Sequence, residues 1–498
     1  SIGYYAGSGT TPNRIGGRNN LDTQFEGPNG DRILQDECQS IDYCPRCDAP
    51  IDVEWDAAEH AVHHVCTGTD CDVGRLPLYV TDHEIYRNVP SILLGTLDRI
   101  TVVGSNPRFA NLIGNITSEC PVHGYGYSSK CSEWTTIKCE ADLKTVDEQF
   151  YDPIPSLHLV DEVHLLGEEL GVFAGHYETL YLELCEQLHG ETPKIVTSTA
   201  TISDRERGDG EPAYQRHVQN LFLRDANRFP VDGPELGESF YGTTTDERLR
   251  RYYGIAPRNK THIYAVLDLV KQFHEVVRDF RERAATELDL DPEAKEKILE
   301  MYELSIVYFL RLTEKDRFTR SIENQIDREM EDDGYESSIE LKQLTADVDD
   351  PDLESLEEPN AGFTERPDTI AATSFIGHGV DVERFNNMFF FGFPSRTFQY
   401  IQASNRVGRR VPGFVVDVFK PFDQRDRHRY RYFSKTHEYL SRAVEDVSVD
   451  RWSKFSLDKT FPGLFKGFLL QYFRPKMFRE YDVNLQSAWD LQVVAHIR

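Results

Sequence analysis

The sequence lacks any long apolar run. Of its 498 residues 39% are hydrophobic, yet no stretch of about 18 consecutive apolar residues occurs, so the length rule for a membrane-spanning helix is not met. The opening SIGYYAGSGTTPNRIGG has neither a basic n-region nor an apolar h-region, and no secretory signal peptide is expected. We expect a globular, cytoplasmic protein with roughly two to four domains.

Lysine is also scarce. The chain has 16 lysines beside 39 arginines, and its 84 acidic residues give a net charge of −29. Acidity of this size usually argues against a nucleic-acid binder. The acidic residues are spread along the whole chain, however, which favours adaptation to a salt-rich cytoplasm where salt screens self-repulsion. Local basic clusters therefore have to be judged individually.

Cysteine is nearly absent after residue 140, because eight of the nine cysteines come earlier. The first group has the paired spacing of a structural zinc site and consists of Cys44, Cys47, Cys66 and Cys71. A second group with looser spacing consists of Cys120, His123, Cys131 and Cys139. Without a signal peptide, zinc ligation is expected rather than disulfides, and reduced, unligated cysteines are the alternative.

Four nearby residues are not expected to bind metal. Cys38 and Cys185 have no partner at a suitable spacing and are predicted to be structural. His63 and His64 could replace one ligand of the first group, but we interpret them as bystanders.

Short apolar runs alternate with amphipathic stretches over about 300 residues, which predicts parallel α/β layers. The apolar run LHLVDEVHLL at 157–166 and the stretch 193–203 are predicted to be buried strands, and 304–312 fits either a strand or a helix. After a first strand at 2–5, the chain to residue 35 is predicted to be loop. The acidic stretch 325–360 is predicted to be a mobile insertion.

An Asp-Glu pair ends the first of these buried strands, in the sequence LVDEVHLL. Ligands bind at the carboxyl ends of parallel strands. There Asp161 could hold Mg²⁺ through water, and Glu162 could deprotonate an attacking water. A solvated strand end is the alternative, and for an isolated Asp-Glu pair it is the more common case.

The segment QASNRVGRR is more specific. Gln402, Arg406 and Arg409 would share one face of a helix through i+4 and i+3 steps. Two guanidinium groups on one face suit a polyphosphate, in the manner of an arginine finger. A basic, solvated helix face is the alternative.

Three further segments are weak individually. TSFIGHGVDV offers a hydroxyl, two glycines and a carboxylate for close approach to a phosphate or sugar, at Thr373, Gly377, Gly379 and Asp381. GTLDRI offers Thr96 and Arg99, and STAT offers the hydroxyls of Thr199 and Thr201.

The order of these segments resembles that of superfamily 2 helicases of the DEAD/DEAH-box kind, over residues 90–420. The resemblance implies two RecA-like domains that hold ATP between them and nucleic acid, most simply DNA, across their tops. It implies that Asp161 holds Mg²⁺, that Glu162 is the catalytic base, and that Arg406 and Arg409 complete the catalytic set. The resemblance further implies nucleotide contacts for His164, Gln402, Gly379 and Asp381. It implies that Thr199, Thr201 and His164 couple the nucleotide to the strand-binding face. It implies nucleic-acid contacts for Thr96, Arg99, Thr373 and Gly377.

One required element is missing. The family cradles phosphates with a Gly-Lys-Ser/Thr loop, and no Gly-Lys dipeptide occurs in the chain. We expect this loop to lie on a missing N-terminal piece or on a separate polypeptide, so that the chain alone would not turn over ATP. The alternatives are half of a split ATPase and a zinc-bearing nucleic-acid-binding subunit without catalysis.

The cysteine-bearing insertions and the tail VEDVSVDRWSKFSLDKTFPGLFKG are similar to the DrmA helicases of the DISARM anti-phage systems, and the tail also to mitomycin-repair helicases. This resemblance implies phage defence and, as partners, other defence subunits. The basic segment DQRDRHRYRYF could stack against and neutralise a single strand, or could be a solvated helix.

The predicted domains follow from these segments. A first RecA-like domain without its phosphate loop covers 1–215, with cysteine-rich insertions at 38–75 and 118–140. A connector at 216–258 leads to a second RecA-like domain at 259–425. Residues 426–498 are predicted to be a helical extension.

Overall fold

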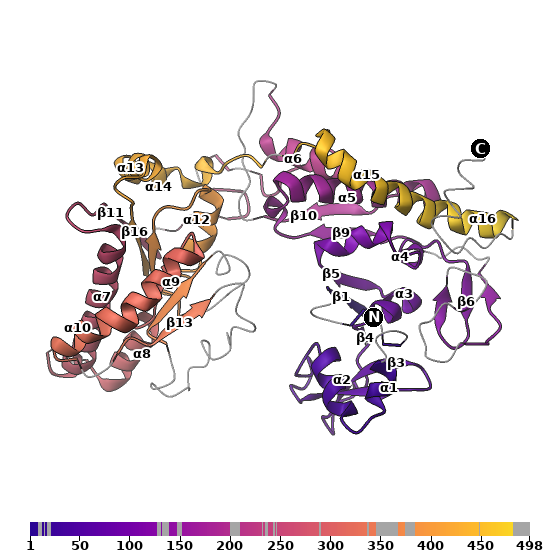
Figure 1. Ribbon diagram of the computed structural model, residues 1–498, viewed down its shortest axis with the longest axis horizontal. Helices are drawn as coiled ribbons and strands as arrows, with labels where there is room; N and C mark the ends of the chain where they lie inside the picture. The colour runs from indigo at the N-terminus through magenta and orange to yellow at the C-terminus, as the bar shows by residue number, and fades with distance from the viewer. Residues whose placement is uncertain are drawn as a thin grey trace. The chain divides into compact units, whose positions relative to one another are not determined.

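The computed structural model describes the chain from residue 1 to residue 481 with several gaps (Figure 1). The gaps are 8–11, 14, 17–20, 127–130, 132–138, 147–151, 200–209, 232, 235–237, 243–244, 246, 288–289, 336–337, 345–366, 374–383 and 448. No helix within the described part is long and apolar enough to cross a membrane.

The chain divides into two compact units. Unit 1 consists of 1–199, 215–226 and 447–498, and unit 2 consists of 200–214 and 227–446. Parallel strands with helices packed on them make up the frame of both units, which confirms the predicted α/β class.

Unit 2 is built on a six-stranded sheet in which every described pairing is parallel. The order is β11 (Arg250–Ile255), β16 (Gly413–Val418), β15 (Asn387–Phe391), β12 (Ser305–Tyr308), β14 (Thr369–Ala372) and β13 (Leu341–Leu344). All residues of β12, β14 and β15 are buried, as expected for central strands covered on both faces. The segment 304–312, which fitted a strand or a helix, thus contributes the central strand β12.

The helices of unit 2 include α7 (His262–Glu287), α8 (Pro292–Tyr302), α9 (Leu312–Ser321), α10 (Asp327–Asp332), α12 (Thr397–Ser404), α13 (Gln424–Arg431) and α14 (Phe433–Glu438). Sequence signals fix several ends: in α8, Asp291 caps the helix by accepting from the Ala294 N–H, with proline at the next position.

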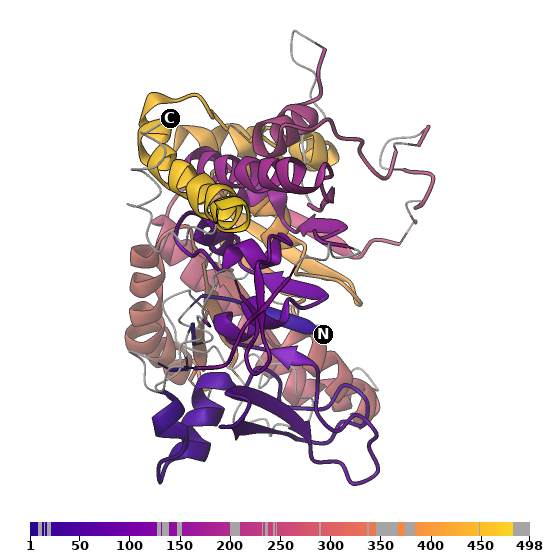
Figure 2. The same cartoon turned by 90° about the vertical axis from the view of Figure 1, so that its right-hand side faces the viewer.

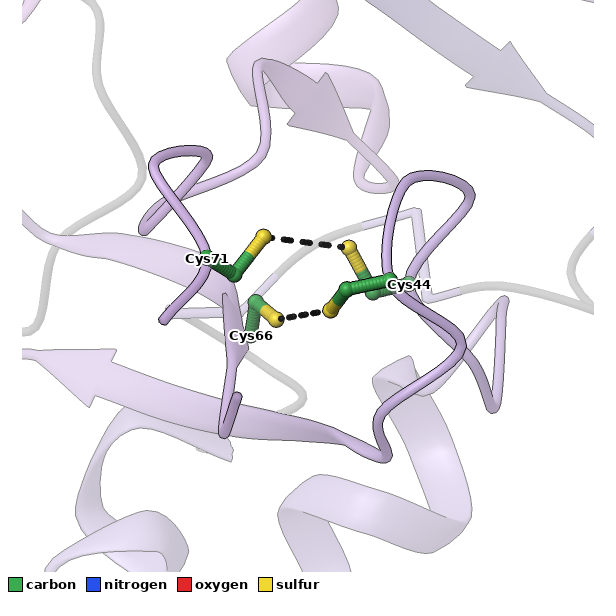
Figure 3. A group of neighbouring side chains, drawn as sticks. Cys44, Cys66 and Cys71 are labelled. Carbon is green, nitrogen blue, oxygen red and sulfur yellow. Dashed lines mark hydrogen bonds between the residues drawn. The ribbon is translucent and has the colours of Figure 1, made fainter. Parts of the chain in front are cut away.

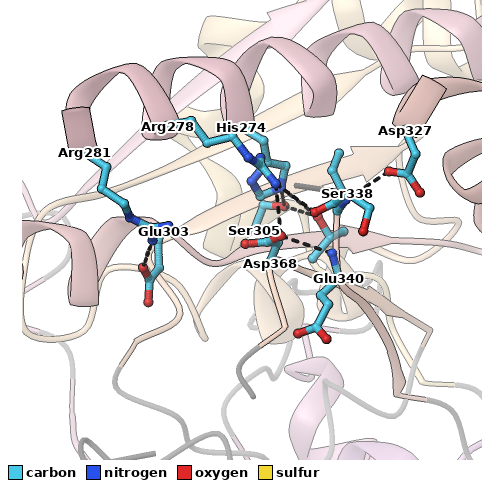
Figure 4. A network of polar contacts seen from close by, with 11 residues as sticks. His274, Arg278, Arg281, Glu303, Ser305, Asp327, Ser338, Glu340 and Asp368 are labelled. Carbon is cyan, nitrogen blue, oxygen red and sulfur yellow. Dashed lines mark hydrogen bonds and ion pairs between the residues drawn. The ribbon is translucent and has the colours of Figure 1, made fainter. Parts of the chain in front are cut away.

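A buried polar network joins α7 to the amino ends of the sheet (Figure 4). His274 Nε2 lies 2.7 Å from Thr369 Oγ1 and 3.2 Å from Ser305 Oγ. Burial lowers the pKa of His274 to about 3, so the ring is neutral. Arg278 donates to Asp368 in the same network. Ser305 and Thr369 are the first residues of β12 and β14, so this histidine anchors the edge opposite to the one where ligands bind.

Unit 1 contains two small parallel sheets. One has the order β4 (Leu78–Tyr79), β1 (Ile2–Tyr5) and β5 (Ile92–Gly95), and the other pairs β9 (Leu157–Val160) with β10 (Lys194–Thr197). Helix α5 (Glu168–His189) follows β9 and ends where Gly190 takes a left-handed conformation.

The expectation that the β9 and β10 strands are buried is wrong for one face. Val160 and Ile195 pack on the core with α5, whereas Leu157 and Leu159 are 51% and 60% exposed. Side chains alternate between the two faces of a strand, and among the described residues only one face of this pair is fully covered.

The C-terminal helices α15 (Lys454–Phe468), η6 (Leu469–Phe473) and α16 (Arg474–Tyr481) return to unit 1. There α15 and η6 pack on α5, and α16 continues from η6 (Figures 1 and 2). Arg451 donates to the carbonyl oxygen of Asn220 and to the Thr179 hydroxyl, and Val449 belongs to the unit 1 core. Gly463 lies directly against Gly104, where a side chain would not fit. Unit 1 is therefore closed by residues that follow all of unit 2.

Two predictions of irregular structure are wrong. The loop expected up to residue 35 contains α1 (Leu21–Phe25) and α2 (Gly30–Cys38). Phe25 and Leu34 join a core with the hairpin of β2 (Ile51–Asp56) and β3 (Ala61–Cys66). The acidic insertion expected from residue 325 begins with ordered helix, because Ile326 and Met330 are buried in the core of unit 2. Their apolar spacing was hidden by the surrounding acidic residues.

Candidate functional site

The Asp-Glu pair stands where β9 ends. Asp161 is exposed, and its Oδ1 accepts from the Glu162 N–H at 2.9 Å and from the Ser198 hydroxyl. Glu162 has φ +50°, a left-handed conformation that turns the chain sharply after the strand. Ser198 directly follows β10, so the carboxyl ends of both strands meet at this pair. The arrangement offers a positioned carboxylate of the kind that holds Mg²⁺ through water.

His164 connects this pair to the end of β10. Its Nδ1 lies 2.8 Å from Thr199 Oγ1 and 3.2 Å from Glu162 Oε2, and its side chain is 2% exposed. A movement of the end of β10 would therefore displace the His164 ring and change its contact with the Glu162 carboxylate. Thr201, the other hydroxyl predicted for coupling, lies outside the described residues.

A second buried histidine was missed by the sequence interpretation. His217, on α6 (Ala213–Phe222), has Nε2 3.1 Å from the Val163 carbonyl oxygen, and burial lowers its pKa. The helix packs through Leu221 and Phe222 on the unit 1 core. Apolar residues at helical spacing in α6 indicated a packed helix, but the polar residues around them favoured the interpretation of 216–258 as a connector.

The segment QASNRVGRR does not form one helix. Helix α12 ends at Ser404, and Arg406 and Arg409 lie in the turn that follows. The predicted shared helical face is therefore wrong in this detail. Gln402 is buried within α12, whereas Arg409 is exposed and its Nε donates to the Asn405 carbonyl oxygen at 3.3 Å.

Gly408 makes this turn possible. Its φ is +66°, and its N–H donates to the Phe385 carbonyl oxygen at 3.1 Å. A Cβ there would lie 2.3 Å from the Leu249 carbonyl oxygen. Arg250 fixes the turn from β11, with Nε 2.7 Å from the Val407 carbonyl oxygen. The glycine of the motif is thus required by backbone packing.

A buried polar cluster of Tyr400, Asp417 and His437 holds α12 in place. The Tyr400 hydroxyl donates to Asp417 Oδ2 at 2.8 Å and lies 2.8 Å from His437 Nε2. Burial raises the pKa of Asp417 to about 8. Together these residues tie α12 to β16 and α14.

Arg99 is not placed to meet a nucleic-acid strand. It is 7% exposed, donates to Asp82 and Asn13 at 3.1 and 2.9 Å, and lies over the Tyr5 ring. Thr96, at the end of β5, is exposed. We therefore leave Arg99 out of the interface proposed below and keep Thr96.

The second predicted contact segment is largely outside the described residues. Thr373 directly follows β14 at its carboxyl end and is partly buried. Gly377, Gly379 and Asp381 lie outside the described part of the chain.

The first cysteine group converges as its spacing predicts (Figure 3). Its four sulfur atoms lie within 4.8 Å of one another, with Cys44–Cys71 at 3.9 Å and Cys47–Cys66 at 3.4 Å. Sulfurs around a tetrahedral zinc are about 3.8 Å apart at a Zn–S distance of roughly 2.3 Å. The donor set and spacing therefore fit zinc.

Backbone N–H groups point at two sulfurs of the first cysteine group, and desolvation together with the close approach of other sulfurs raises the pKa of Cys66 and Cys71. The N–H groups of Arg46 and Cys47 lower the pKa of Cys44 to about 7. The Gly68 N–H donates to Cys66 Sγ at 3.4 Å. The group sits at the open end of the hairpin formed by β2 (Ile51–Asp56) and β3 (Ala61–Cys66). His63 pairs with Glu59 and His64 is buried elsewhere, so both stand outside this group.

The second cysteine group converges as well. Cys120 Sγ lies 3.9 Å from Cys139 Sγ and 3.7 Å from His123 Nδ1, and Cys131 Sγ lies 3.5 Å from the same nitrogen. Three sulfurs and one imidazole nitrogen are an accepted structural zinc set. Cys185, by contrast, is fully buried, and burial raises its pKa to about 12.

Comparison with known proteins identifies part of the chain. The model of the helicase conserved C-terminal domain matches residues 318–411, from α9 to the turn that holds Arg409. The DISARM protein DrmA of Bacillus paralicheniformis (strain ATCC 9945a / NCIMB 11709 / CD-2) is 27% identical over 535 residues, covering 100% of this chain and 45% of DrmA. The chain is a homologue of DrmA. It spans less than half the length of that relative.

Solved helicases have similar but distant structures. The DUF1998 helicase MrfA bound to DNA has a TM-score of 0.49 at 11% identity, covering 94% of this chain and 48% of MrfA. The Mycobacterium smegmatis helicase Lhr bound to single-stranded DNA and AMP-PNP has a TM-score of 0.41 at 12% identity, covering 76% and 39%.

Proposed function

We propose that the chain forms the motor part of an ATP-dependent helicase or translocase that acts on DNA in an anti-phage system. The observation that carries this proposal is the helicase C-terminal domain at 318–411, which contains Arg406 and Arg409 and occurs in a chain that also presents Asp161 and Glu162 at the end of a parallel strand. The homology to the DISARM protein DrmA supports the defence role.

The roles follow from the geometry of unit 1. Asp161, fixed by the Ser198 hydroxyl, would hold Mg²⁺ through water, and the ion would neutralise phosphate charge. Glu162 would orient and deprotonate the attacking water. His164 transmits the state of Glu162 to Thr199 and hence to the end of β10.

Unit 2 would contribute positive charge. Arg406 and Arg409 stabilise the charge that gathers on the transferred phosphoryl group. Their positions depend on the turn at Gly408 and not on a continuous helix. Thr96 and Thr373 would contact the nucleic-acid backbone, each from the carboxyl end of a parallel strand.

The phosphate cradle is proposed to lie outside these 498 residues, since they contain no Gly-Lys dipeptide. Further sequence of the same polypeptide or a second subunit would provide it. We propose in addition that the two cysteine groups hold one structural zinc each, because both bring four suitable donors within bonding reach of a single ion.

The decisive experiment is DNA-stimulated ATP hydrolysis over a series of salt concentrations. It compares the 498-residue chain with the product of the whole reading frame in which the chain lies. In the active protein, Glu162→Gln should lower kcat at least about 100-fold while ATP still binds, because only the water-activating group is removed. Glu169→Gln, an exposed change nearby on α5, serves as the matched control.

The outcomes separate the alternatives. Hydrolysis only by the longer product supports a motor whose cradle is on the same polypeptide. Hydrolysis only after a second subunit is added supports a split ATPase. Wild-type turnover in Glu162→Gln would refute the role of Glu162, and DNA binding without any hydrolysis would favour a binding subunit.

A further inference from the structure

We propose that the exposed face of α13 is a binding platform for a single nucleic-acid strand. The platform consists of Arg425, Arg427, His428 and Arg431 with Phe422 just before the helix. This inference rests on the proposed function, because it names the surface of unit 2 that would hold the strand. It adds a site separate from Thr96 and Thr373.

The platform is held rigidly by the opposite face of the helix. Asp426 is buried, and its carboxylate accepts from the Lys420 N–H at 2.8 Å. The Arg429 guanidinium lies 4.9 Å from the centre of the Phe393 ring and donates to the Thr397 hydroxyl at 3.2 Å. Asp423 caps the helix by accepting from the backbone N–H groups of Arg425 and Asp426. The outward side chains therefore start from a fixed backbone.

Asp426 is buried, and the exposed Asp423 accepts from two backbone N–H groups, so arginines outnumber acidic residues on the outward face. Arg425, Arg427 and Arg431 are exposed and, among the described residues, form no ion pair. They line a shallow groove together with Asp423, Gln424 and His428, so that three arginines and one carboxylate face it. In a chain of net charge −29, three exposed arginines on eight residues are a local exception that general surface acidity does not explain. Exposed guanidinium groups gathered on one short helix are what binding to backbone phosphates requires.

Aromatic rings stand beside the charges. Phe422 is 97% exposed, which costs hydration free energy unless a flat apolar partner covers it. Tyr430 and Tyr432 are 42% and 44% exposed, and the Tyr432 ring lies 4.8 Å from the His428 ring. Rings beside arginines are what a single strand requires, since bases stack on the rings while phosphates meet the guanidinium groups. A duplex hides its base faces and would leave Phe422 unused.

The platform lies at the functional edge of the sheet. Helix α13 follows the carboxyl end of β16, and Thr373 follows the carboxyl end of β14 in the same parallel sheet (Figure 1). The contact from Arg429 to Thr397 places α13 against the start of α12, the helix that leads to Arg406. A nucleic-acid strand bound on the platform would therefore lie close to α12, the helix that leads to Arg406 and Arg409.

The test measures binding of a fluorescent oligothymidylate by anisotropy at several salt concentrations. The triple variant Arg425→Gln, Arg427→Gln, Arg431→Gln should reduce the slope of log K against log salt by about 2, since each phosphate contact on a single strand contributes roughly 0.7. If the variant and the wild type bind equally at 1 M salt, this difference in slope makes the variant bind about 100-fold more weakly than the wild type at 0.1 M salt. Phe422→Ala should lower affinity about tenfold with an unchanged slope, because it removes stacking and no charge.

A matched control removes the same charge elsewhere in unit 2. Lys297→Gln, Arg320→Gln and Arg328→Gln change exposed residues of α8, α9 and α10 and should leave affinity and slope near wild type. If the platform variant binds like wild type while the chain binds DNA, the platform is refuted and the proposed function stands. If the wild-type chain and the longer product bind no nucleic acid, both fail together.

Two further probes test the identity of the ligand. A duplex of equal length should show less dependence on Phe422 than oligothymidylate, and equal dependence would overturn the single-strand assignment. Loss of poly-L-glutamate binding with retention of oligothymidylate binding in the triple variant would reassign the surface to an acidic protein.

Discussion

Replacement of Gly408 by alanine is the sharpest test of how the QASNRVGRR segment is built. At φ +66° an alanine has left-handed strain of roughly 1–2 kcal/mol. In addition its Cβ would lie 2.3 Å from the Leu249 carbonyl oxygen and 3.0 Å from the Gly413 nitrogen. These two atoms share a hydrogen bond of 2.8 Å that pairs the ends of β11 and β16.

The clash has to be relieved by moving the backbone, because no flexible side chain is involved. Losing the buried bond between Gly413 and Leu249 costs about 1–3 kcal/mol beyond the strain. We therefore expect Gly408→Ala to lower the free energy of unfolding of unit 2 by about 2–5 kcal/mol. Arg409 would be displaced as well, since its Nε bonds to the same turn.

A control variant separates strain from clash. Gly334 has φ +93°, also in unit 2, but nothing lies within 4 Å of its Cβ position. Gly334→Ala shares the left-handed strain and the reduced entropy of the unfolded chain, so the difference between the variants isolates the clash at about 1–3 kcal/mol.

The assay is hydrogen exchange of β15 and β16 peptides during urea unfolding. The two tryptophans within the described residues, Trp55 and Trp452, belong to unit 1, so their fluorescence reports unit 1 and should not change in either variant. If Gly408→Ala destabilises unit 2 no more than Gly334→Ala, the packing of Gly408 against the Leu249 carbonyl oxygen does not stabilise this turn.

Two further predictions concern pH and metal. The folded pKa of Asp417, about 8, lies above its unfolded value, so its buried carboxyl favours folding at low pH, and the free energy of unfolding falls as pH rises from about 4 to about 8. Asp417→Asn should abolish this part of the pH dependence in urea titrations, and an unchanged pH profile would contradict the burial argument. Purified chain should contain two zinc ions by atomic emission; Cys66→Ser and Cys131→Ser should each lose one, while the control Cys185→Ser keeps both. Loss of both ions from one cysteine change would show that the sites are not independent.

The parallel α/β frame and the cysteine groups were predictable because they depend on local spacing. Runs such as residues 387–391 are buried on both faces, and that composition is visible in the sequence. The cysteine pairs need only two short turns and a hairpin to converge. Asp161 and Glu162 were found because they directly follow a strand.

Other features depend on tertiary contacts that spacing does not encode. The helix expected to carry Arg406 ends at Ser404, because Gly408 packs against the carbonyl oxygen of Leu249, which lies just before β11 and more than 150 residues earlier. Arg99 was expected at the surface, but its partner Asp82 comes from a helix whose position no local pattern gives. His217 was missed because its helix is short and polar on most of its surface.

The return of the C-terminal helices to unit 1 sets an order for synthesis on the ribosome. Unit 2 has all its strands once residue 418 has emerged, and it can fold while translation continues. Unit 1 has to wait for Arg451, Gly463 and Gln471, whose partners lie on segments made hundreds of residues earlier. Its half-finished core would stay open for the time needed to make unit 2, roughly tens of seconds at bacterial rates. A stop codon shortly after residue 446 would therefore leave a second unit with all its strands attached to a first unit that lacks its closing helices.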